Sequence, residues 1–72
     1  MARENYVVVS AGDQWRISFS GNLYGFYADA AAAIAVARDT AQKTADAGQA
    51  AAVLVETPSG NFRTEAEFEA KA

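Results

Sequence analysis

Apolar and polar side chains alternate without interruption over residues 15–20, where the sequence reads WRISFS. A period of two places every second side chain on the same face, which predicts a half-buried strand. The side chains predicted to face inward are Trp15, Ile17 and Phe19. The stretch Tyr6–Ser10 is rich in β-branched residues and favours a strand as well. Residues 11–14 (AGDQ) lie between the two and predict a turn.

A third strand is predicted over residues 23–27 (LYGFY). It follows Gly21-Asn22, a pair of residues that favours a hairpin turn. The first part of the chain is therefore predicted to form a three-stranded meander.

An alanine-rich stretch from about residue 30 to residue 47 has the period of a helix. Asp29 is a good N-cap before this stretch, and Gly48 is a good stop after it. At 100° per residue, small side chains gather on one face, and these are Ala33, Ala37, Thr40, Ala41 and Thr44. The opposite face is charged, with Asp39 and Lys43 at the favourable i,i+4 spacing. The pattern predicts an amphipathic helix whose thin buried face allows it to lie close to a sheet.

The second half of the chain predicts a hairpin. Residues 51–55 are continuously apolar, as expected of a strand near the middle of a sheet. Residues 57–61 (TPSGN) favour a turn, and residues 62–65 are predicted to form an edge strand. The remaining residues 66–72 are acidic and alanine-rich, with Phe68 as their one large apolar anchor. They are predicted to form either a frayed tail or a short helix.

Together these elements predict one small domain over residues 1–72, with an ordered core from about residue 5 to residue 65. The fold class is α+β. We expect a single antiparallel sheet of four to five strands with one long helix packed on one face, in the order β-β-(β)-α-β-β.

Several landmarks of this order are similar to those of a known group of proteins. They are a strand centred on Trp15, a helix capped by Asp29 and continuing through Ala33-Ile34, Ala37-Arg38 and Ala41, and a hairpin turn at Ser59-Gly60-Asn61. In these features the chain resembles a family of small bacterial domains of unknown function, over roughly Tyr6 to Phe68. The resemblance implies the fold and a bacterial origin. It implies no activity and no site residues.

The composition argues against catalysis and against cofactors. The 72 residues include no cysteine and no histidine, so disulfides are impossible and zinc or haem would lack their usual ligands. The commonest general base and the strongest nucleophile are missing for the same reason. The alternating Glu65, Glu67 and Glu69 are interpreted as a solvated terminal segment rather than as a cation site. We therefore predict no catalytic, cofactor-binding or metal-binding residues, and no enzymatic activity.

Charge and hydropathy restrict the partners. Nine acidic and six basic residues give a net charge of −3, which disfavours nucleic acids and anionic membranes. No stretch approaches the roughly twenty apolar residues of a membrane-spanning helix. The first ten residues contain no apolar run of signal-peptide length. We therefore expect an acidic cytoplasmic protein that does not bind membranes.

The strands carry more apolar surface than one helix can cover. Residues 7–9 (VVV) and 53–55 (VLV) point to alternating faces, so both faces of the sheet are apolar. A sheet that curls on itself and ordinary exposed apolar atoms are two alternative explanations. We favour homo-oligomerisation through the uncovered face or a strand edge, most simply as a dimer. The candidate interface residues are Tyr6, Val8, Tyr24, Tyr27 and Leu54.

An alternative function follows from the sequence Tyr24-Gly25-Phe26, since RNA-recognition sheets present a similar aromatic-Gly-aromatic core. The basic residue expected before it is replaced by Leu23, and the βαββαβ order is absent. Arg16, Tyr24 and Arg63 are the candidate residues of such a single-strand-binding face. The preferred prediction is a non-enzymatic, self-associating module with a binding or structural accessory role, and weak single-strand binding is the alternative.

Overall fold

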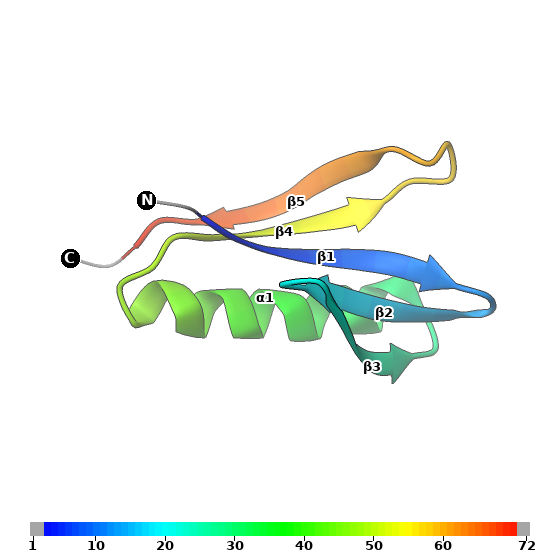
Figure 1. The fold of residues 1–72 in the computed structure, drawn as a ribbon, viewed down its shortest axis with the longest axis horizontal. Helices are drawn as coiled ribbons and strands as arrows, with labels where there is room; N and C mark the ends of the chain where they lie inside the picture. The colour runs from blue at the N-terminus through cyan, green and yellow to red at the C-terminus, as the bar shows by residue number, and fades with distance from the viewer. Residues whose placement is uncertain (1–2, 71–72) are drawn as a thin grey trace.

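Three strands, a helix and two further strands follow one another in a computed structural model that describes residues 3–70. The elements are β1 (Glu4–Ala11), β2 (Gln14–Phe19), β3 (Asn22–Tyr27), α1 (Ala30–Asp46), β4 (Ala51–Glu56) and β5 (Phe62–Phe68). The helix lies along one face of a five-stranded sheet (Figure 1). The α+β class and the predicted order of elements are confirmed.

The strands are ordered β3-β2-β1-β4-β5, so β1 is the central strand. Neighbouring strands are antiparallel except β1 and β4, which are parallel. The sheet is therefore mixed, whereas the sequence patterns predict a purely antiparallel one. The reason is the direction of the chain. Strand β3 runs in the same direction as β1, and α1 then returns the chain to the end of the sheet where β1 starts. Strand β4 therefore runs alongside β1 in the same direction. A crossover of this kind is what parallel pairing requires.

The core lies between α1 and the central strands. Alternate side chains of β1, β2 and β4 point towards the helix, and those buried there are Tyr6, Val8, Ile17, Ala51, Val53 and Val55. Trp15 and Phe19 pack against this core while partly exposed, which confirms the inward face predicted for β2. The helix contributes only methyl groups to the fully buried layer, from Ala33, Ala37, Ala41 and Ala45.

The boundaries of α1 follow from its caps. The Asp29 side chain accepts a hydrogen bond from the Ala32 backbone N–H at 2.8 Å, as expected of an N-cap. On the exposed face, Lys43 Nζ lies 3.2 Å from Asp39 Oδ2. The buried alanines are four residues apart, so the buried stripe is rotated slightly from the predicted one, and Thr40 is exposed.

Strand β5 is longer than predicted. It continues to Phe68, because Ala66 pairs with Val53 and Phe68 pairs with Ala51, and both side chains pack against the core. A register shift between Val53 and Leu54 adjusts the pairing so that these two side chains face α1. The prediction of a tail or helix is therefore wrong for residues 66–68, and residues 71–72 lie outside the described range.

A bulge shapes the pairing of β2 with β3. Trp15 pairs with Tyr27 and Ile17 pairs with Tyr24, which leaves two residues of β3 opposite one residue of β2. The bulge contains Gly25, whose φ of +72° is one that other residues rarely adopt. A Cβ atom at Gly25 would lie 2.5 to 2.7 Å from atoms of the Tyr27 ring. Glycine is thus required there both for the backbone conformation and for the position of Tyr27.

We expect Gly25→Ala to lower the free energy of unfolding by more than Gly12→Ala. Both substitutions impose the left-handed conformation on alanine, at a cost of roughly 1–2 kcal/mol. At Gly12, where φ is +66°, a Cβ atom would have nothing within 4 Å, whereas Gly25→Ala must also displace the Tyr27 ring. Urea unfolding followed by circular dichroism measures the difference. Equal losses for the two variants would show that the Tyr27 ring moves without cost.

Candidate functional site

The face of the sheet opposite α1 carries a band of apolar side chains. Val7 pairs with Ser18 on one side and with Leu54 on the other, and Val9 pairs with Arg16. These two valines alternate along β1 with the buried residues Tyr6 and Val8, so they point away from the helix. We name this surface the open face, and its apolar residues are Val7, Val9, Leu23, Phe26, Leu54 and Phe62.

Arg16 is held in place on the open face. Its guanidinium carbon lies 4.3 Å from the centroid of the Phe26 ring, a cation–π contact. Its Nε donates to the Gly25 carbonyl at 3.0 Å, and its Nη2 donates to the Leu23 carbonyl at 3.3 Å. The side chain therefore lies flat across β3 and fixes the bulge beneath it.

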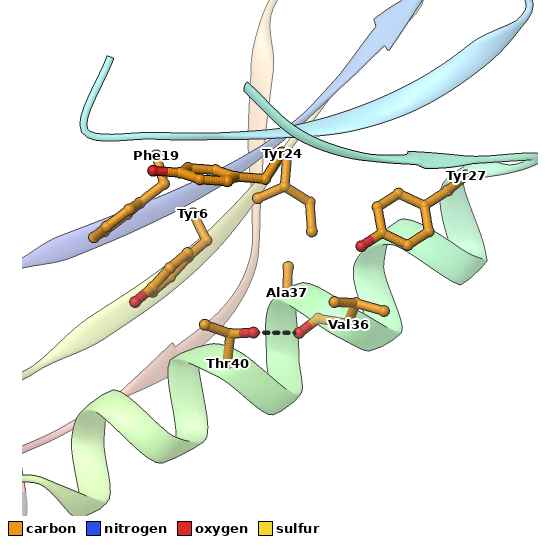
Figure 2. Close-up of a pocket in the computed structure, with 8 residues that line it drawn as sticks. Tyr6, Phe19, Tyr24, Tyr27, Val36, Ala37 and Thr40 are labelled. Carbon is orange, nitrogen blue, oxygen red and sulfur yellow. Dashed lines mark hydrogen bonds between the residues drawn. The ribbon is translucent and has the colours of Figure 1, made fainter. Parts of the chain in front are cut away.

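A cavity of about 380 Å³ lies on the other side of the sheet, between the β2–β3 hairpin and α1. Four aromatic side chains surround it in Figure 2, those of Tyr6, Phe19, Tyr24 and Tyr27. Ile17 also lines the sheet side, and α1 contributes Val36, Ala37 and Thr40. The rings of Tyr6 and Phe19 are stacked with centroids 4.5 Å apart and an interplanar angle of 9°.

The polar groups of this cavity are hydroxyls. The Tyr6 hydroxyl lies 2.7 Å from Thr44 Oγ1, which holds the ring at its far end. Thr40 Oγ1 donates to the Val36 carbonyl at 3.0 Å. Within residues 3–70, the hydroxyls of Tyr24 and Tyr27 have no hydrogen-bond partner. None of the eight lining residues is charged, so the cavity is suited to neutral molecules.

A smaller cavity, of about 260 Å³, lies at the end of the sheet beside the β4–β5 turn. Glu56, one of its lining residues, accepts hydrogen bonds through Oε1 from the Ser10 backbone N–H at 2.9 Å and from Ser10 Oγ at 3.1 Å. The carboxylate thereby extends the contact between β1 and β4 past their last backbone pair, Val8–Val55. We assign Glu56 a structural role at this position.

No family model, curated protein or solved structure matches this chain. The resemblance to small bacterial domains therefore stays a prediction. Across residues 3–70, no three His, Cys, Asp or Glu side chains are grouped to hold a metal ion. The described part of the chain also contains no helix long and apolar enough to cross a membrane.

The five predicted interface residues do not lie on one surface. Tyr6 and Val8 are buried beneath α1, so the prediction that they lie on an uncovered face is wrong. Tyr24 and Tyr27 lie on the helix side and line the cavity. Leu54 is the member of the set that lies on the open face, beside Val7.

The sequence did contain a signal for this assignment. The turn between β1 and β2 has two residues, and it sets the register in which Val8 pairs with Ile17. The alternation in β2 predicts that Ile17 faces inward, and directly paired residues share a face, so Val8 must face inward too. The same register argument moves Val7 and Val9 to the open face, where periodicity alone does not place them.

The three candidate residues for nucleic-acid binding do not converge either. Arg16 lies on the open face, whereas Tyr24 points to the helix side. Arg63 lies on β5, where it pairs with Val55 of β4. Strand β5 is three strands away from β2, which carries Arg16, so the two backbones are separated by roughly 14 Å. Arg63 also forms an ion pair of 2.9 Å with Glu65. The predicted stacking platform with two arginines is therefore not formed.

Proposed function

We propose that this protein is a small, non-enzymatic module that self-associates as a two-fold dimer, open face against open face, in a binding or structural accessory role. The observation that carries the proposal is the apolar band of the open face. Phe26 is 67% exposed at one side of the band and Phe62 is 54% exposed at the other. Several large apolar side chains exposed on one face typically mark an interface.

The arrangement of the open face supports a second copy of the same chain as the occupant. Its midline is β1, with Val7 and Val9. When two open faces meet, a two-fold axis that lies between them and parallel to β1 places the β2–β3 half of each copy over the β4–β5 half of the other. Both halves carry a large ring at their outer side, so Phe26 of one copy meets Phe62 of the other. An isologous dimer requires self-complementarity of this type.

The charges on either side of Val9 are also complementary under this rotation. Arg16 is level with Val9 on β2, and Glu56 follows the Val8–Val55 pair by one residue on β4. At the level of Val9, the sheet therefore carries a cation on the β2 side of the midline and a carboxylate on the β4 side. The same two-fold axis places the Arg16 side of each copy over the Glu56 side of the other, so like charges do not face each other across the interface. Both charged groups keep their partners within their own chain, Arg16 on β3 and Glu56 at Ser10.

The edges of the sheet are less suited to pairing than its face. β3 is bulged at Gly25, and β5 is irregular near Glu65, which forms an ion pair with Arg63. Bulges and charges of this kind are common protection against edge-to-edge pairing. This is why we place the interface on the open face rather than at a strand edge.

The size of the open face sets the expected strength of the dimer. Five strands spaced about 4.8 Å apart make the sheet roughly 20 Å wide. A face of this width corresponds to the low end of specific interfaces, so a concentration-dependent equilibrium in the micromolar range is expected. A cytoplasmic, bacterial setting is part of the proposal. The lack of cysteine in so small a domain supports the cytoplasmic part, since small secreted domains are rich in disulfides.

We expect Val9→Lys to separate the dimer without unfolding the chain. The lysine would place a charge at the centre of the interface, where its desolvation is unfavourable. Val36→Lys is the matched control, because Val36 is 40% exposed on α1, on the opposite side of the sheet. Sedimentation equilibrium at about 100 µM should give a dimer for the wild type and Val36→Lys and a monomer for Val9→Lys. A monomeric wild type, or a dimeric Val9→Lys, would contradict the proposal.

A further inference from the structure

We infer that the cavity between the β2–β3 hairpin and α1 is a binding site for a small neutral molecule, one with an aromatic ring and a single hydrogen-bonding group. The site is on the opposite side of the sheet from the open face and is independent of dimerisation. Its volume of about 380 Å³ lies in the range of small-molecule sites.

The cavity is there because the side chains around it cannot close it. On the helix side, Ala37 contributes a single methyl group. On the sheet side, the Tyr6 ring is held by two contacts. Its face stacks on Phe19, and its hydroxyl forms a hydrogen bond with Thr44. Tyr27 is held next to Gly25 by the bulge of β3. The lining is thus preformed on a helix and three strands, which lowers the entropic cost of binding a ligand.

The lining residues determine the chemistry of the ligand. Aromatic rings on several sides favour another ring, which can bind by offset stacking or edge-to-face contact. The absence of charge among the eight lining residues disfavours an ion, whose lost hydration nothing would replace. The hydroxyl of Tyr27, which points towards the helix side of the cavity in Figure 2, can donate to or accept from one polar group on the ligand.

The volume limits the size of the ligand. At about 30 Å³ per non-hydrogen atom, the share of one water molecule in the liquid, the cavity holds roughly a dozen such atoms. A fused bicyclic alcohol is of this size. With the modest energy per atom expected of a small ligand, the dissociation constant should lie at roughly 0.1 to 1 mM.

The probe for the test is 2-naphthol, titrated into the 15N-labelled wild-type chain. We expect saturable shifts of the amide signals of Gly25, Tyr27 and Thr40, which line or adjoin the cavity. Val36→Phe should weaken binding by about tenfold or more, because the larger side chain enters the cavity from its rim. Ala35→Phe, on the exposed side of the same helix turn, should bind as the wild type does.

A cationic probe of similar size, trimethylphenylammonium, separates a neutral site from an aromatic cage for cations. We expect it to bind more weakly than 2-naphthol, and tighter binding would overturn the assignment of ligand class. The absence of concentration-dependent shifts at the cavity with 2-naphthol up to about 2 mM, or shifts centred on Val7 and Leu54, would overturn the site itself. Equal binding to Val36→Phe and Ala35→Phe would do the same.

Discussion

Val8→Asp is expected to prevent folding, whereas Val9→Asp is expected to leave the chain folded. Val8 is fully buried in the central strand, paired with Ile17 on one side and with Val55 on the other. A carboxylate there would lose its hydration and gain no partner, which costs more than about 4 kcal/mol. A domain of this length has roughly 4 to 11 kcal/mol of stability in total. A small domain buries little of its surface and lies towards the low end of that range, where this loss is enough to unfold it.

The neighbouring position differs because it lies on the other face of the same strand. Val9 is half-buried on the open face, and an aspartate there can reach water. The expected loss is about 1 kcal/mol, the difference in strand propensity between valine and aspartate. Circular dichroism in dilute solution, where dimerisation does not contribute, measures both variants. If Val8→Asp folds as well as Val9→Asp does, the assignment of the two faces of β1 is wrong.

Ala41→Leu is expected to destabilise the protein by about 1–3 kcal/mol, and Ala37→Leu by distinctly less. Both alanines are fully buried on the same stripe of α1. Ala37 lines the 380 Å³ cavity, so three extra carbon atoms can enter it. Neither described cavity is lined by Ala41, so a leucine there must push the helix away from the sheet.

Thermal unfolding measures this difference. For a domain of this size, 1 kcal/mol corresponds to roughly 4–8 °C in Tm, so Ala41→Leu should unfold well below Ala37→Leu. Ala37→Leu should also abolish the binding of 2-naphthol, since it occupies the same space. Equal losses of stability would show that the cavity does not accept a side chain from Ala37.

The open face and the cavity are on opposite sides of one sheet, so the two proposed properties can coexist. Dimerisation through the open face leaves the β3–α1 side accessible to a ligand. Arg16 and Tyr27 connect the two sides through the same bulge, because Arg16 binds the Gly25 carbonyl and the Tyr27 ring lies against Gly25. Independent loss of dimerisation in Val9→Lys and of ligand binding in Val36→Phe would establish them as separate functions.

The local elements of this protein were determined by its sequence. Each strand, the N-cap at Asp29 and the stripe of alanines on α1 depend on interactions within a few residues, and these can be read from periodicity and turn chemistry. The partial failure came at β5, where residues 66–68 look like a polar tail. They form a strand because Ala66 and Phe68 pack on a core that the rest of the chain builds.

Pairing between strands, rather than the period of any single strand, decided which of two equivalent faces of β1 became the core. A strand such as VVV is apolar on both sides, and its period of two says nothing about the side on which a helix will pack. That choice placed Val8 inside and Val9 outside, and it separated Arg16 from Tyr24. The cavity has the same origin: it exists because rings from three strands meet a helix of alanines, and contacts between distant segments leave no pattern along the chain.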